Sequence, residues 1–78
     1  MSSHIIFPNL RAELARSNLR VQDVAAILEL SRDSTGAKLS GKGKIYLDEA
    51  FRIRNAFFPK LGVDYLFAKE SNDGKDTA

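Results

Sequence analysis

The glycines and lysines of residues 35–44, TGAKLSGKGK, have the composition of a phosphate-binding loop. Gly36, four further residues, Gly41 and Lys42 match a Walker A loop up to its last position, where Gly43 replaces serine or threonine. Such a loop also needs a preceding strand and a helix that begins at its lysine. No strand pattern precedes Gly36, so the sequence does not predict a nucleotide site.

The carboxylates and the single histidine do not form a catalytic or metal-binding set. The chain has no cysteine and its only histidine is His4, so thiolate chemistry is excluded and a zinc site lacks ligands. The acidic residues are better explained as helix-start and surface residues, namely Asp23, Asp33, Asp48, Glu49 and Asp64. We therefore expect a protein that is not an enzyme and holds no cofactor, metal ion or small-molecule ligand.

The length and the termini indicate one small domain. A chain of 78 residues buries too little apolar surface for two cores. The N-terminal HIIF run has neither a basic flank nor a long apolar stretch, so we expect no signal peptide, no membrane span and a cytoplasmic protein. We assign residues 1–7 to an N-terminal arm, 8–68 to the domain and 69–78 to a polar, disordered tail.

Apolar residues recur at helical spacings through the domain. Leu10 and Leu14 are one turn apart, and Val21, Val24 and Leu28 follow at spacings of three and four. The pattern predicts helices over residues 8–17, 21–29, 32–40 and 47–58, with a last short helix or turn at 63–67. No run alternates with a period of two, so the predicted fold class is all-α.

The helix predicted over residues 32–40 has little to bury. Ser31 precedes it as a good N-cap, and only Thr35 and Leu39 can face a core. Its other faces are therefore exposed. Residues 32–44 carry four basic side chains and one acidic side chain, an excess that suits an anionic partner.

The two helices on either side of residues 29–31 have the form of a helix-turn-helix. A recognition helix enters a major groove about 12 Å wide, so it lacks bulky apolar side chains on its outer face. Arg32, Asp33 and Ser34 meet that description. Lys42 and Lys44, just beyond the helix, are placed to reach phosphates.

From Asn9 to Phe67 the sequence resembles the Cro/C1-type, or Xre, helix-turn-helix family. The resemblance is carried by four segments: NLRAELARSN, LRVQDVAAILELSRDSTGAKLSGK, YLDEAFRIRNAFF and VDYLF. Within the family, the sequence is most similar to short phage or mobile-element repressors of Gram-positive bacteria. It implies a compact five-helix, lambda-repressor-like DNA-binding domain. It also implies a sequence-specific transcriptional regulator, in most cases a repressor, that binds operator DNA as a homodimer.

The resemblance assigns DNA-binding roles to particular positions. Arg32 and Asp33 occupy the base-reading first turn of the recognition helix, Ala37 occupies a third reading position, and Ser34 and Lys38 complete the candidate set. The candidate phosphate contacts are Arg20, Ser31, Ser40, Lys42 and Lys44. Arg32 is the strongest candidate, because arginine can bind guanine O6 and N7 with two hydrogen bonds.

Several positions depart from the family pattern. Arg20 replaces the serine or threonine that caps the second helix, and Val21 replaces a phosphate-contacting glutamine. Glu29 stands where glycine is common, which predicts a different turn or a strained, left-handed backbone. Gly36 adds no side chain to the reading surface. These departures leave open an alternative, a helix-turn-helix fold used as a protein-interaction module, such as an inhibitor or antirepressor of a mobile element.

Aromatic residues are dense near the end of the domain. Five of them fall within residues 51–67, more than a core this small needs. We therefore expect Phe58 and Tyr65 to be exposed at a dimer interface. The same region can be covered by Ile5, Ile6 and Phe7, and the other aromatic residues belong to the core: Phe51, Phe57 and Phe67.

Overall fold

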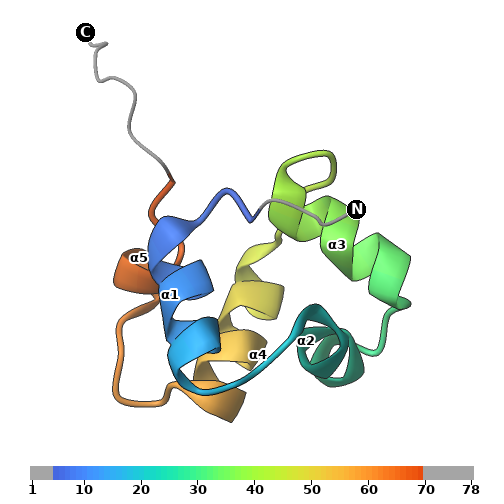
Figure 1. Cartoon of the computed structure of the whole chain (residues 1–78). Coiled ribbons are helices and arrows are strands. Elements are labelled where there is room, and N and C mark those ends of the chain that lie inside the picture. The colour runs from blue at the N-terminus through green and yellow to red at the C-terminus, as the bar shows by residue number, and fades with distance from the viewer. Residues whose placement is uncertain (1–4, 70–78) are drawn as a thin grey trace, which may run out of the picture.

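The computed structural model describes residues 5–69 as five helices, with no strand among these residues (Figure 1). The helices are α1 (Pro8–Arg16), α2 (Val21–Leu28), α3 (Arg32–Ser40), α4 (Leu47–Phe57) and α5 (Val63–Leu66). The all-α prediction is confirmed, and each predicted helix boundary lies within one residue of the observed one. The predicted disordered tail, residues 69–78, lies outside the described residues except for Lys69, and His4 also lies outside them.

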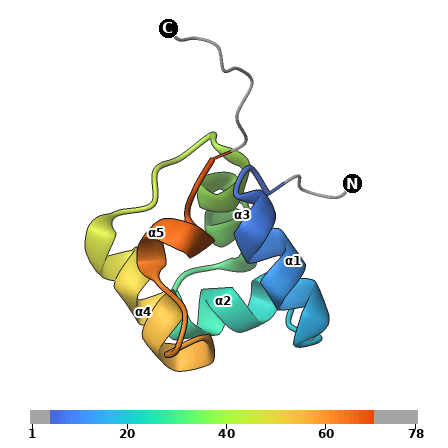
Figure 2. The same ribbon diagram turned by 90° about the vertical axis from the view of Figure 1, so that its left-hand side faces the viewer.

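The helices pack in a closed arrangement around one core. α2 lies against α3 and α4, and α5 lies against α1 and α4 (Figures 1 and 2). The longest helix, α4, has 11 residues, and a bilayer-spanning helix needs about 20. Within residues 5–69, no helix is long and apolar enough to cross a membrane.

Local sequence signals begin and end these helices. The Ser31 Oγ accepts a hydrogen bond from the Ser34 N–H at 3.0 Å, which confirms the predicted N-cap of α3. The Asp23 carboxylate accepts from the Arg20 N–H at 2.9 Å, so α2 begins without the usual serine or threonine. Gly41 ends α3 with a φ of +96°, a left-handed conformation that favours glycine.

The connection between α2 and α3 is tight and strained. Glu29 adopts φ +59° and ψ +41°, in the left-handed region that non-glycine residues rarely enter. The Leu30 N–H donates to the Ala25 carbonyl at 3.0 Å and closes the turn. Of the two alternatives expected at Glu29, a different turn or a left-handed backbone, the structure shows the left-handed backbone.

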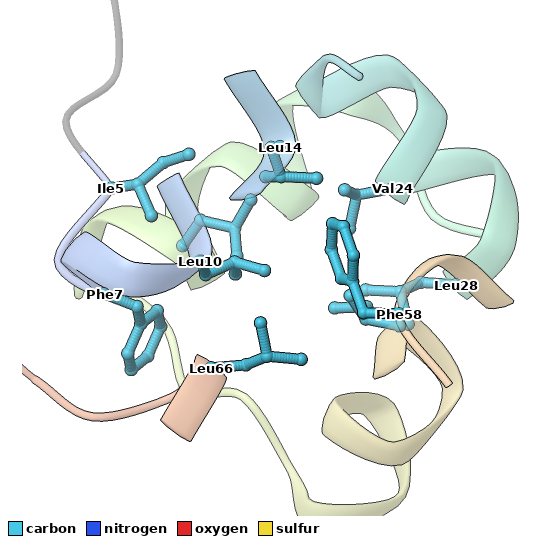
Figure 3. Packing of buried hydrophobic residues seen from close by; sticks show 10 residues of the cluster. Ile5, Phe7, Leu10, Leu14, Val24, Leu28, Phe58 and Leu66 are labelled. Atoms are coloured by element: carbon cyan, nitrogen blue, oxygen red, sulfur yellow. The ribbon is translucent and has the colours of Figure 1, made fainter. Parts of the chain in front are cut away.

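The core draws on all five helices and on the segment before α1. Leu10, Val24, Leu39, Ile53 and Leu66 are fully buried, one from each helix. Figure 3 shows side chains of this cluster converging from several elements. Because each helix contributes at least one such side chain, α3 is held in place by the same core as the rest of the domain.

The described part of the N-terminal arm belongs to this core. Ile5 and Phe7 are buried, and the Ile6 N–H donates to the Leu39 carbonyl at 2.9 Å. The Phe7 and Phe67 rings meet edge to face, with centroids 5.2 Å apart. The expectation that these residues cover a dimer surface is wrong for Ile5 and Phe7, because their side chains are used inside their own chain.

Phe58 also differs from the prediction. We expected it at a dimer interface, yet its side chain is only 7% exposed and points into the same core as Val24 and Leu28 (Figure 3). Its ring packs edge to face with Phe57, at a centroid distance of 6.1 Å. The reason is its place after the last turn of α4, where φ −137° and ψ +58° turn the side chain away from the helical period.

Candidate nucleic-acid interface

Two buried side chains attach α3 to the domain. Thr35 and Leu39, one helical turn apart, are the buried residues of this helix, as the sequence predicted. The Thr35 Oγ1 has no hydrogen-bond partner within the described part of the chain. Since so little of α3 is needed for packing, its remaining surface is left for another role.

The first turn of α3 is polar and exposed. Arg32, Asp33 and Ser34 all lie open to solvent, as expected for residues that contact a partner. Within residues 5–69, the side chains of Arg32 and Asp33 make no hydrogen bond or ion pair. A guanidinium with five donors and a carboxylate with acceptor oxygens therefore occupy consecutive positions of α3, with their hydrogen-bonding capacity unused within the described residues.

The second turn of α3 presents little side-chain volume. Gly36 and Ala37 are half-buried, and neither carries a hydrogen-bonding side chain. The Ala37 carbonyl accepts from the Ser40 Oγ at 3.2 Å and from the Gly43 N–H at 2.9 Å. Small side chains let the helix backbone approach a flat surface closely, so Ala37 offers a partner only apolar contact.

Lys38 is occupied within the domain. Its Nζ donates to the Lys44 carbonyl at 3.0 Å and lies 3.3 Å from Glu49 Oε1. It also lies 4.7 Å from the centroid of the Tyr46 ring, a cation–π contact. The base-reading position assigned to Lys38 thus holds a side chain that ties α3 to the loop before α4.

The candidate phosphate contacts fall into two groups. Arg20, Lys42 and Lys44 are exposed cations, at the start of α2 and on the loop that follows α3. Ser31 and Ser40 use their hydroxyl groups locally, one accepting at the α3 N-terminus and the other donating to Ala37. Only the first group offers a positive charge to a phosphate backbone.

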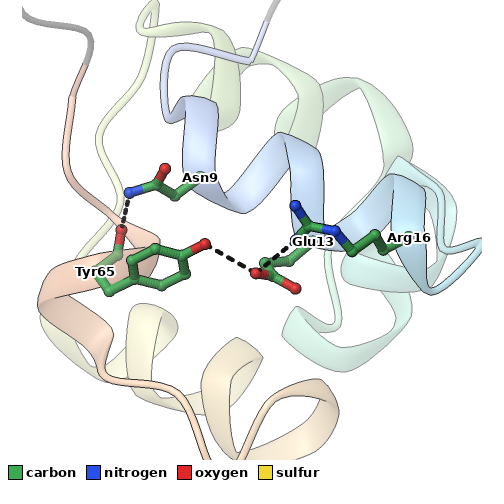
Figure 4. A network of polar contacts seen from close by, with 4 residues as sticks. All are labelled: Asn9, Glu13, Arg16 and Tyr65. Carbon is green, nitrogen blue, oxygen red and sulfur yellow. Dashed lines mark hydrogen bonds and ion pairs between the residues drawn. The ribbon is translucent and has the colours of Figure 1, made fainter.

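Tyr65 belongs to a polar network that joins α5 to α1 (Figure 4). Its hydroxyl donates to Glu13 Oε2 at 2.8 Å, and Arg16 lies at the same distance from that oxygen. The Asn9 side chain donates to the Tyr65 carbonyl at 2.9 Å. The tyrosine hydrogen bond, aided by Arg16, holds the pKa of Glu13 below its ordinary value, and the same bond raises the pKa of Tyr65. The ring of Tyr65 is 40% exposed, in line with the predicted exposure.

Sequence reasoning missed an exposed apolar surface at the start of α4. Tyr46, Leu47 and Phe51 are 60%, 68% and 40% exposed, although Phe51 was predicted to belong to the core. α4 carries two apolar stripes, and only the one with Ala50 and Ile53 faces the core. The sequence held a signal for this, because positions 47 and 51 lie one helical turn apart, on a different stripe of the helix from the buried residues Ala50 and Ile53.

Comparisons of this chain with models of protein families, with curated proteins and with solved structures found no match. Within residues 5–69, no histidine and carboxylate side chains gather into a group that could hold a metal ion. The candidate interface consists of unused donors and acceptors on the first turn of α3, flanked by exposed cations.

Proposed function

We propose that this chain is a lambda-repressor-like helix-turn-helix protein that binds DNA in a sequence-specific way and regulates transcription. In this proposal α2 and α3 form the helix-turn-helix, and α3 enters the major groove. The observation that carries the proposal is the surface of α3. Thr35 and Leu39 anchor the helix, while Arg32, Asp33 and Ser34 leave their polar groups open to solvent.

Each polar residue of the first turn has a defined role in the proposal. Arg32 binds guanine O6 and N7 through two parallel hydrogen bonds. Asp33 accepts a hydrogen bond from a cytosine amino group. Ser34 donates or accepts a hydrogen bond at an A·T or a G·C base pair. Arg32 contributes most to specificity, because a bidentate contact is worth about 1 to 3 kcal/mol of discrimination against a wrong base.

The exposed cations supply affinity without sequence preference. Arg20, Lys42 and Lys44 bind phosphates, and each contact releases counterions from the duplex. Lys38 acts through the loop, since its contacts with the Lys44 carbonyl and Glu49 hold the loop in one conformation. A preordered loop loses less conformational entropy when it binds.

The proposal includes a homodimer that acts as a cytoplasmic repressor. A dimer would place two α3 helices on a palindromic operator, with half-sites about one helical turn apart. A single copy of a domain this small has few base contacts, so a second copy raises specificity as well as affinity. Tyr65 remains a candidate for the dimer surface, because part of its ring is exposed.

The test is selection of binding sites from randomised duplex DNA, with the wild type and Arg32→Ala, at two salt concentrations. We expect a roughly palindromic motif for the wild type and a loss of preference at one base pair per half-site for Arg32→Ala. Discrimination at that pair should fall by about 1 to 3 kcal/mol. Binding should weaken steeply with salt for both proteins.

A matched control is Arg52→Ala, which removes an exposed arginine from α4 instead of α3. It should leave the selected motif unchanged. Salt-sensitive binding with no enriched motif would leave only non-specific affinity. Absence of binding at both salt concentrations would remove the proposal.

One observation favours a second candidate function, a helix-turn-helix fold used as a protein-interaction module. The exposed apolar residues Tyr46, Leu47 and Phe51 suit contact with a protein better than contact with DNA. In addition, Val21 is a half-buried apolar residue where the family resemblance leads one to expect a phosphate-binding glutamine. A protein partner bound through apolar contacts would hold at high salt, where DNA binding is lost.

A further inference from the structure

A groove of about 610 Å³ separates the N-terminal segment from the starts of α4 and α5. Its apolar walls include Ile6, Ile45, Leu47, Val63 and Phe67, which come from three separate parts of the chain. A groove of this size accepts a few large side chains or a drug-sized molecule. The base-reading residues of the proposed function, Arg32, Asp33 and Ser34, take no part in these walls, whereas Lys38 and Lys44 border the groove.

The rim of the groove is positively charged. Lys38, Lys44 and Lys69 line it, and among the described residues that line it there is no carboxylate. Lys38 is balanced by Glu49, but Lys44 and Lys69 make no ion pair within residues 5–69. An occupant that fits the groove therefore combines an apolar body with negative charge.

Apolar surface continues outside the groove along α4. Leu47 lines the groove and is 68% exposed, and Phe51, one helical turn further on, is 40% exposed. Tyr46 adds a ring that is 60% exposed beside them. A molecule that sits only inside the groove would leave this stripe uncovered, whereas a segment of protein would cover both.

Residues 1–4 and 70–78 do not have the composition of such a segment. Residues 1–4 are MSSH and residues 70–78 are ESNDGKDTA, so Met1 is the only large apolar residue in either. A second copy paired through the same face by a two-fold axis would bring two lysine-lined rims together. That arrangement brings like charges together and is unfavourable.

We propose that this groove and the stripe along α4 bind an acidic, amphipathic helical segment of another protein. Apolar side chains of the segment, three and four residues apart, enter the groove and cover Leu47 and Phe51. Carboxylates along its edge pair with Lys44 and Lys69. The inference goes beyond DNA binding, because its principal residues lie outside α3.

The test is selection from a displayed library of random peptides of about 16 residues, long enough for about four helical turns. The whole 78-residue wild type and Leu47→Asp serve as parallel targets. Peptides enriched on the wild type should carry apolar residues at helical spacing together with Asp or Glu. Their Kd should rise about tenfold or more on Leu47→Asp and several-fold on Lys69→Glu.

Matched controls share each chemical change but lie elsewhere. Ala56→Asp adds the same carboxylate to an exposed position of α4, and Lys60→Glu reverses an exposed charge between α4 and α5. Both should bind the selected peptides as the wild type does. Because Leu47 and Lys69 are exposed, their variants should also keep the wild-type unfolding midpoint and the wild-type DNA motif.

Three results would overturn this inference. The first is a selection in which no peptide is enriched on the wild type relative to Leu47→Asp. The second is a set of enriched peptides that lack acidic residues or bind Leu47→Asp as well as the wild type. The third is light scattering that shows a wild-type dimer which Leu47→Asp separates, because a second copy would then be the occupant. Peptide selection, peptide affinity and light scattering can all be measured even if no DNA motif is selected. The DNA-binding proposal and the peptide-binding proposal can therefore fail separately.

Discussion

The outer surface of α3 and the groove at the start of α4 are both bordered by cations, yet they differ in what lies between those cations. On α3 the neighbours of Arg32 are polar or small, namely Asp33, Ser34, Gly36 and Ala37. At the groove, the residues that lie between the lysines are mostly large and apolar. Positive charge alone indicates an anionic partner, but it does not distinguish a nucleic acid from an acidic protein. The neutral residues distinguish a surface that suits base edges from one that suits apolar side chains.

The two surfaces also differ in how they are held. α3 depends on two buried residues and on a capped first turn. The groove depends on segments that are far apart in the sequence and meet only in the folded domain. Substitutions can therefore separate the role of a residue in packing from its role at a surface.

The largest expected effect contrasts a buried leucine of α3 with an exposed leucine of α4. Leu39→Ala should lower the free energy of unfolding by about 2 to 5 kcal/mol, because it empties a fully buried site. Leu47→Ala should change it by less than about 0.5 kcal/mol, since that side chain is 68% exposed. Urea denaturation measures both. Equal losses would mean that the two helices are not anchored as described.

A smaller effect is expected at the start of α3. Ser31→Ala removes the oxygen that accepts from the Ser34 N–H, so unfolding should become easier by about 1 kcal/mol. Ser34→Ala is the matched control, because the Ser34 side chain is exposed and has no part in the cap. Thermal unfolding followed by circular dichroism distinguishes them. A control as damaging as Ser31→Ala would contradict the capping role.

Lys38→Gln tests whether this residue reads bases or holds the loop. Loss of its contacts with Glu49 and the Lys44 carbonyl should weaken binding to every DNA sequence by the same factor, about 2- to 5-fold. A base-reading residue would instead change the preference at one position. Affinities for a set of single-base variants of the selected site separate the two roles.

The smallest effect is expected at Tyr65. Tyr65→Phe removes the hydrogen bond that, with Arg16, lowers the pKa of Glu13. A lowered pKa in the folded state means that the unfolded state binds more protons in acid, so this stabilisation is present near neutral pH and lost as pH falls through the lowered pKa. The variant should be slightly less stable at neutral pH, with a shallower loss of stability in acid.

Tyr46→Phe is the control for this measurement, because the Tyr46 ring is exposed and its hydroxyl makes no hydrogen bond within the described residues. Melting temperatures between pH 3 and pH 7 provide the comparison. If the melting temperature fell equally steeply in acid for the wild type and for Tyr65→Phe, the assigned cause of the lowered Glu13 pKa would be contradicted.

The sequence predicted the helices well, for local physical reasons. Apolar spacing, Pro8, Ser31 and Gly41 act within one or two turns of where they stand. The left-handed backbone at Glu29 was one of two alternatives that the family resemblance left open, and the structure has it. The resemblance to a repressor family added candidate roles for the residues of α3, and these roles remain proposals.

The errors share a physical origin. Phe58 was expected at the surface and is buried, because it stands past the last turn of α4, where helical spacing no longer sets its direction. Phe51 was expected in the core and is exposed, as is Leu47 one turn before it, because the core covers only one of the two apolar stripes of α4. Periodicity shows that a residue lies on an apolar stripe, but not whether another element packs against that stripe.

The sequence by itself determined the helix boundaries, the N-cap of α3 and the small, polar character of its outer face, because these depend on residues close together in the chain. Only the tertiary structure decided which apolar stripe is covered, where the Lys38 ammonium lies and that a cationic groove exists. Those features join Ile6, Lys38, Leu47 and Phe67, which are far apart in the sequence. Contacts between such distant residues are set by the packing of the whole domain and not by local preference.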